Sequence, residues 1–209
     1  MIYARDTNPA EIPFGTLSRT VAPTIDPVTL AEAKKHLNLD HTDDDAYVTD
    51  LISVATAHAE SYTNRQLITA TYSLTFNGFP DIITLPKPPA SSITSLTYVD
   101  GAGTTQTLTQ GTDFNWQLPS GPFASQARVF PAYGLYWPAT RDYMPSVSIV
   151  YVAGYGVTAA TVPIAIRQAI KAVVATLYEY REEVVTGTIK TEIPEVARRL
   201  MYPYRVLAV

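Results

Sequence analysis

The spacing of apolar residues changes twice along the chain. Over residues 29–64 they recur every three or four positions, which predicts one helix over 29–38 and a second, about twenty residues long, ending at Asn64. From residue 66 to about 155 apolar and polar positions alternate, as they do in half-buried β-strands. The helical spacing returns from Pro163 to about Glu183, and a last short helix is expected over Glu195–Met201.

Capping signals mark the ends of these helices. Thr29 and Glu32 have the spacing of a capping box, and Thr42 with Asp45 gives a second start signal. Asn64 suits a left-handed helix end. Gly187 is expected to break the third long helix, and Pro203 to end the last one.

The β region is expected to hold six short strands separated by prolines and turns. Asp100-Gly101 is a hairpin signal between two of them. We expect these strands over 71–76, 92–99, 106–109, 114–118, 127–130 and 147–152. Short strands with frequent turns favour a small antiparallel sheet, sandwich or barrel.

The order helices, strands, helices predicts an α+β fold. In this fold an antiparallel β domain, sandwich- or barrel-like, is inserted between the second and third helices of an α-helical bundle. Residues 28–65 and 156–209 would form the bundle and residues 66–155 the β domain. Residues 1–27 hold four prolines and no sustained period, so we expect an extended N-terminal arm there.

Charge is distributed unevenly over these parts. Residues 1–65, 66–155 and 156–209 carry net charges of −5, −1 and +2, and the middle part has only three basic and four acidic residues. A surface depleted of charge is typical of proteins that remain in contact with a partner. An ordinary β domain that happens to be poor in charge is the alternative.

Most chemical functions lack a sequence signal. The absence of cysteine excludes disulfides, thiolate catalysis and Cys-ligated metals. The acidic turn after Asp40 fails as a calcium loop, because Asp45 and Leu51 stand where glycine and glutamate are needed. The Gly101-Ala102-Gly103 stretch is a turn, and no catalytic cluster, secretory signal or run of about 18 apolar residues is present. We therefore expect no enzymatic activity, cofactor, metal or membrane contact.

Aromatic residues gather in the second half of the β region. They are Trp116, Phe130, Tyr133, Tyr136 and Trp137. Such a set can be a platform for sugars or bases, but nucleic-acid binding also needs a basic patch, which is missing here. Packing in the core or at an interface is the stronger interpretation.

Several short motifs stand in one shared order over residues 28–206. Residues 30–37 fit the pattern L-x-E-A-K-x-H-L, and residues 62–68 fit a helix ending T-G-R-x-L, with Asn64 in place of the usual glycine. Further motif segments are 85–89, 152–155, 162–170, 178–182 and 199–205. Together these motifs resemble those of tailed-phage head–tail connector (adaptor, or head completion) proteins.

This resemblance implies a structural virion protein at the head–tail junction, assembled in the host cytoplasm. It would form a ring, typically dodecameric, between the portal and the stopper or tail. The ring would extend the channel through which DNA passes without specific binding. Candidate portal-docking residues are Arg198, Arg199, Tyr202, Tyr204 and Arg205, because they are of the types that dominate interface energies. A carbohydrate- or host-binding β module mounted on a helical base is the competing hypothesis.

Overall fold

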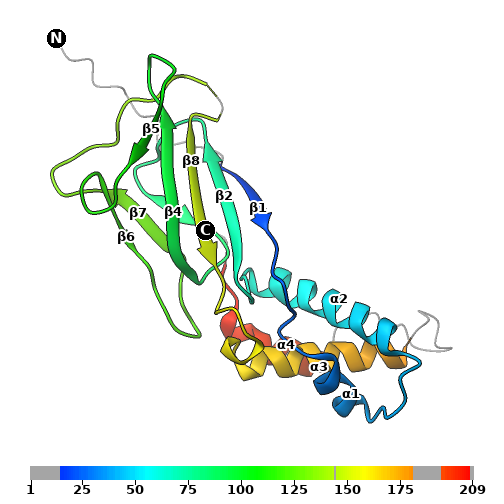
Figure 1. The fold of residues 1–209 in the computed structure, drawn as a ribbon. Helices are drawn as coiled ribbons and strands as arrows, with labels where there is room; N and C mark the ends of the chain where they lie inside the picture. The colour runs from blue at the N-terminus through cyan, green and yellow to red at the C-terminus, as the bar shows by residue number, and fades with distance from the viewer. Residues whose placement is uncertain (1–14, 144, 181–193, 208–209) are drawn as a thin grey trace, which may run out of the picture.

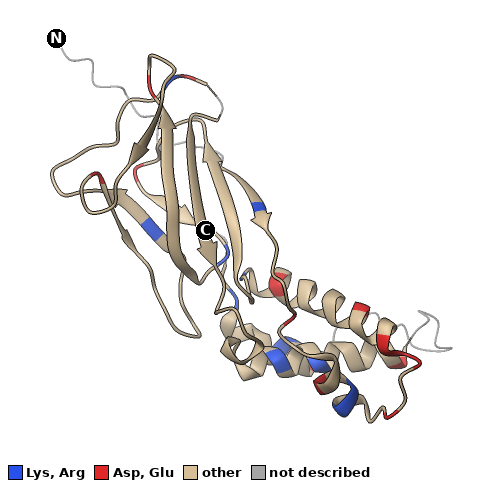
Figure 2. Cartoon of the chain, in the orientation of Figure 1, with Lys and Arg blue, Asp and Glu red and all other residues tan. Residues whose placement is uncertain are grey.

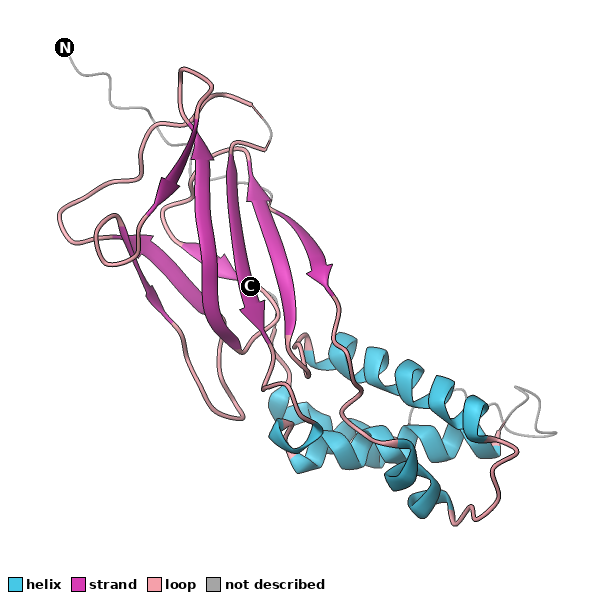
Figure 3. Ribbon diagram, in the orientation of Figure 1, coloured by secondary structure: helices cyan, strands magenta, loops and turns pink. Residues whose placement is uncertain are grey.

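The computed structural model describes residues 15–143, 145–180 and 194–207. The helices gather at one end of an elongated molecule and the strands at the other (Figure 1). The chain is α+β as expected, with the strands β2 to β8 placed between the second and third α-helices (Figure 3). The expected break at Gly187 lies outside the described residues.

Within the described residues, four α-helices build the helical end. They are α1 (Leu30–Leu37), α2 (Asp45–Thr63), α3 (Ile164–Glu179) and α4 (Glu195–Met201), with short 3-10 turns at Ala159–Thr161 and Tyr202–Tyr204. Their apolar stripes meet in one core, which includes Ile52 of α2, Ile170 of α3 and Met201 of α4, each at most 2% exposed. Apolar residues at helical spacing thus produce this packing.

The observed helix ends can be compared with the capping residues expected from the sequence. Thr29 and Glu32 form the capping box at α1, and Asn64 ends α2 in a left-handed conformation with φ 53°. The second start signal was wrong in detail. Asp44 occupies the N-cap of α2 without a side-chain cap, and Thr42 accepts a hydrogen bond from Asp45 through its backbone carbonyl.

The β end consists of two antiparallel sheets packed on a second core. The five-stranded sheet has the order β1-β2-β8-β4-β5 and the three-stranded sheet the order β3-β7-β6. The strands are β1 (Thr16–Val21), β2 (Ala70–Phe76), β3 (Ile83–Leu85), β4 (Ala90–Val99), β5 (Thr105–Leu108), β6 (Phe114–Gln117), β7 (Ala127–Pro131) and β8 (Val147–Ala153). The buried core between the sheets includes Leu74, Leu96, Val129 and Ile149.

Strand β1 lies where an N-terminal arm was expected. Residues 16–21 are extended, but they pair with β2 over the register Thr16↔Thr75 to Val21↔Thr71. They are therefore a strand of the sheet rather than a separate arm. Alternation of Leu17 with polar neighbours is the only local signal for this strand, and the prolines on both sides obscure it.

The outward side of the five-stranded sheet lacks charge. Arg19 is the only charged residue of the five strands, and it pairs with Tyr72, whose ring is buried. One outward row crosses all five strands at Thr16, Thr75, Ser148, Thr97 and Thr107. The next rows hold Ser18, Ser73, Val150 and Ser95, and then Val21, Thr71, Val152 and Ser92. We call these residues the hydroxyl face.

Candidate interaction surfaces

The segment after α2 joins the two ends of the molecule. Arg65 is 3% exposed, and its guanidinium donates from Nε to the Tyr204 carbonyl at 2.5 Å and from Nη1 to the Ala124 carbonyl at 2.7 Å. Burial lowers the pKa of Arg65 from its usual value. One side chain therefore holds the C-terminal segment and the β6–β7 loop against the end of α2. The sequence marked this motif only by its resemblance.

A second buried cluster follows directly. Gln66 donates to the Glu60 carboxylate at 2.6 Å and accepts a hydrogen bond from the Tyr72 hydroxyl. Glu60 also accepts from the Leu67 backbone at 3.0 Å, and Arg19 lies 3.9 Å from its other oxygen. Burial raises the pKa of Glu60, against the opposing effects of the Leu67 hydrogen bond and Arg19. This cluster connects α2 with β1 and β2.

Gly154 explains another motif of the resemblance. Its φ is 130°, and a Cβ there would lie 2.7 Å from the Thr69 backbone nitrogen. Only glycine fits where β8 leaves the sheet this close to the start of β2. Next to it, Tyr155 donates from its hydroxyl to the Pro122 carbonyl at 2.8 Å. The junction is thus held by hydrogen bonds from several segments that lie far apart in the sequence.

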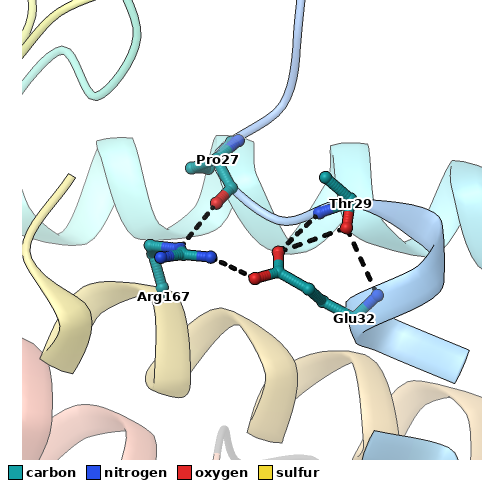
Figure 4. A network of polar contacts seen from close by, with 4 residues as sticks. All are labelled: Pro27, Thr29, Glu32 and Arg167. Atoms are coloured by element: carbon teal, nitrogen blue, oxygen red, sulfur yellow. Dashed lines mark hydrogen bonds and ion pairs between the residues drawn. The ribbon is translucent and has the colours of Figure 1, made fainter. Parts of the chain in front are cut away.

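A third polar network holds the first helix onto the third. Arg167 of α3 donates to the Pro27 carbonyl at 3.1 Å and pairs with the Glu32 carboxylate (Figure 4). Glu32 also caps α1 by accepting a hydrogen bond from the Thr29 backbone at 3.0 Å. The pKa of Glu32 is lowered, mainly by that backbone hydrogen bond and further by Arg167, although partial burial opposes the shift.

The structure divides the candidate docking residues of the C-terminal segment into two kinds. Arg199 has an exposed side chain, and Tyr202 is 67% exposed. Tyr204 instead stacks on Phe123, with ring centroids 4.9 Å apart, and Arg205 lies over the ring of Tyr62.

Arg198 and Arg199 both pair with Glu195 on the same helix. The Val206 backbone donates to the Thr63 carbonyl at 2.9 Å. The segment is therefore part of the fold, and only some of its side chains face outward.

The aromatic candidates of the β domain also separate. Trp137 stacks on Phe79 with centroids 4.6 Å apart and donates to the Asp81 carbonyl, and Trp116 packs against the β core. Tyr133 and Tyr136 are 104% and 93% exposed. Phe130 is 37% exposed and follows Val129, which is fully buried, so it points away from the core. The tryptophans are structural, whereas the side chains of Phe130 and the two tyrosines are exposed.

Charged residues concentrate in the helical end and are sparse in the β domain (Figure 2). Some opposite charges there are already paired within the chain, because Lys34 lies 2.5 Å from Asp45 and Arg167 pairs with Glu32. The neutral β region inferred from the sequence is thus a property of the folded surface as well.

The described residues contain no arrangement typical of a metal site or a membrane span. No group of three His, Asp or Glu side chains in them is placed to hold a metal ion. None of the described helices is long and apolar enough to cross a membrane. An open groove of about 590 Å³ between the β domain and α3 is lined mostly by proline, glycine and other small residues, with Arg167 at its edge. This groove holds no set of catalytic side chains.

The comparison with protein families bears on the first half of the chain. Residues 27–98 match the family of phage gp6-like head-tail connector proteins. The resemblance inferred from the sequence is thereby confirmed over these residues. The matched residues run from the capping box of α1 through the Arg65 junction into β4. Among curated proteins, no match to the chain is found.

Solved structures with the same fold come from gene transfer agent (GTA) particles. The fold is similar to a chain in the neck of the empty GTA particle, computed with C6 symmetry, with TM-score 0.74 and 24% identity. A chain in the native GTA virion gives 0.72, and one in the native neck, computed with C12 symmetry, gives 0.69, both at 24% identity. Each comparison covers 93% of this chain and 97% of the other.

Proposed function

We propose that this chain is a structural protein of the head–tail junction in a phage-like particle. It forms a ring adaptor between the portal and the stopper or tail, and the ring extends the channel for DNA. The observation that carries this proposal is the match of residues 27–98 to head-tail connector proteins. The shared fold with neck chains adds to it, and the C12 symmetry of one neck structure supports a dodecamer.

A closed ring needs two different complementary surfaces on each subunit. The helical end and the charge-poor β domain each offer exposed surface for such contacts. We propose that they act as separate domains, since they have separate hydrophobic cores. Strand β1 belongs with the β domain in this division, whereas residues 28–65 and 156–209 supply the helical bundle.

For portal docking we propose the exposed side chains of the C-terminal segment, led by Tyr202 and Arg199. Removing residues 202–209 is a poor test, because it deletes the carbonyl that Arg65 binds and so destabilises the fold. The variants Tyr202→Ala and Arg199→Ala should fold normally and bind a purified portal ring more weakly. Arg141→Ala, an exposed arginine beside the β4–β5 hairpin, is the matched control and should bind normally.

Imaging of the purified full chain by negative stain, alone and with a portal ring, tests the proposed function. Rings with an open centre are expected in at least one of the two samples. A chain that stays monomeric and unbound in the presence of the portal contradicts the adaptor role. The absence of enzymatic activity stays a prediction of this proposal.

One observation favours the alternative of a carbohydrate- or host-binding β module. Tyr133 and Tyr136 are almost fully exposed in the segment after β7, as aromatic residues that stack on sugars would be. Binding of the full chain to immobilised glycans, lost in the Tyr133→Ala and Tyr136→Ala variants, would support this alternative. Ring formation without glycan binding would exclude it as the main function.

A further inference from the structure

The outward residues of the five-stranded sheet have an unusual chemistry for a surface in water. An antiparallel sheet with one solvated face normally carries polar and charged residues there. On the hydroxyl face the row Thr16–Thr75–Ser148–Thr97–Thr107 crosses the whole sheet, and no outward residue of the five strands is charged. Valines lie near the centre of this face, at positions 150 and 152.

Part of the hydrogen-bonding capacity of this face is already used inside the sheet. Thr75 donates from its hydroxyl to the Thr16 carbonyl at 3.5 Å, and Thr97 donates to the Ser148 carbonyl at 3.4 Å. A group that is already paired loses little when water leaves. Covering this face with another protein therefore costs less than covering a charged face.

The outward side of the three-stranded sheet carries a different surface, in which Arg128 of β7 is charged and the aromatic residues beyond it are not. Phe130 points outward from the three-stranded sheet, and the segment after it holds the exposed Tyr133, Leu135 and Tyr136. This β7–β8 segment arches out on the side of the β domain away from β1 (Figure 1). We call Phe130 and these three residues the aromatic face. Phe130 and the hydroxyl face lie on opposite sides of the core between the two sheets, so Phe130 cannot cover the hydroxyl face of its own chain.

We propose that the hydroxyl face of one subunit is covered by the aromatic face of a neighbouring copy. Tyrosine rings pack on threonine and valine methyl groups, and their hydroxyls pair with the remaining free serine and threonine hydroxyls. The two faces are different parts of one subunit's surface, so the contact is head to tail, as a ring requires, rather than that of a symmetric dimer. The inference rests on the proposed ring and names the β-domain surfaces that form it.

The area of the hydroxyl face limits how much of the interface between subunits it can form. Five strands about 4.8 Å apart and three rows of outward residues span about 400 Å², against about 800 Å² per partner in a standard interface. The contact therefore supplies about half of an interface, and the helical end supplies the rest. A DNA-facing role fits less well, because the face has no basic residue to hold phosphates.

Cross-linking tests the contact directly, because the chain has no cysteine of its own. In rings of the full-length Ser73→Cys/Tyr133→Cys double variant, a flexible bismaleimide should produce a ladder of covalent multimers. Each single variant should give none, since the two faces meet only each other. Rings that form without a ladder overturn the assignment of the faces and leave the adaptor role intact. Dimers from Ser73→Cys alone overturn it too, because they indicate a symmetric contact.

A charge variant provides an independent test. Ser73→Lys places an unpaired charge at the centre of the hydroxyl face and should lower the yield of rings at least about tenfold, with an unchanged circular dichroism spectrum. Ala102→Lys, at the exposed tip of the β4–β5 hairpin, is the matched control and should assemble normally. Normal ring yield in Ser73→Lys overturns the proposal. Failure of the wild-type chain to form rings with a portal overturns the proposed function itself.

Discussion

The buried guanidinium of Arg65 makes a sharp test of how the two ends of the molecule are joined. Replacing Arg65 with methionine keeps a long, flexible side chain in a similar space but removes every donor. The Tyr204 and Ala124 carbonyls then lose the donors that lie 2.5 and 2.7 Å away. Ala124 is 4% exposed, so water cannot easily replace the lost donor there.

The expected cost follows from these two bonds. A hydrogen bond to a charged group contributes about 1.5–3 kcal/mol, and an orphaned buried carbonyl costs about 1–3 kcal/mol. Methionine avoids the desolvation of a buried charge, which offsets part of the loss. We expect Arg65→Met to lower the free energy of unfolding by about 3 kcal/mol. For a chain of 209 residues this corresponds to a fall in Tm of about 6–12 °C.

Thermal and urea unfolding, followed by circular dichroism, measure this change. Arg128→Met is the matched control, because Arg128 is an exposed arginine on β7 and its replacement should stay within about 0.5 kcal/mol of wild type. Fluorescence of a probe attached near the C-terminus should report earlier detachment of that segment in Arg65→Met. A free energy of unfolding within about 1 kcal/mol of wild type would refute the structural role of Arg65.

Three further predictions test other parts of the fold. Because the pKa of Glu32 is lowered in the folded state, its contribution to stability is present above the unfolded pKa and is lost as the pH falls through the folded pKa. Glu32→Gln should therefore flatten the acid side of a plot of stability against pH, below about pH 5. An unchanged plot would contradict this. In urea unfolding, Trp137→Ala should lower the free energy of unfolding by about 3 kcal/mol, whereas Tyr133→Ala should lower it by less than about 0.5 kcal/mol. Equal losses would contradict the division between structural and surface aromatic residues. Asn64→Gly should be tolerated, whereas Asn64→Ala should lower the free energy of unfolding by about 1 kcal/mol, because φ is 53° there. A stabilising alanine would rule out the left-handed cap.

The sequence predicts the helices well because their signals are local. The capping box at Thr29 and the left-handed end at Asn64 are both present, and the last helix has the expected bounds, Glu195–Met201. Hydrophobic spacing and capping depend on residues within one or two turns of each other, so they can be interpreted without the rest of the chain.

The missed features depend on contacts between distant residues. Strand β1 pairs with residues fifty or more positions away, and β3 has only three residues, so neither has a strong local pattern. The same reason applies to the candidate surfaces. Composition alone grouped Tyr204 with Tyr202 and Trp137 with Tyr136, whereas the fold buries part of each pair against Phe123 and Phe79.

The distribution of charge separates the forces that would act in assembly. In the helical end, Lys34 and Arg167 already have acidic partners in the same chain, so fewer charges remain for contacts between subunits than the sequence totals imply. The outward residues of the hydroxyl face carry no charge that salt could screen. Salt weakens exposed ion pairs but not the packing of neutral groups. An adaptor ring built as proposed should therefore lose its helical contacts first as ionic strength rises, while cross-linking between Ser73→Cys and Tyr133→Cys should persist for as long as the rings do.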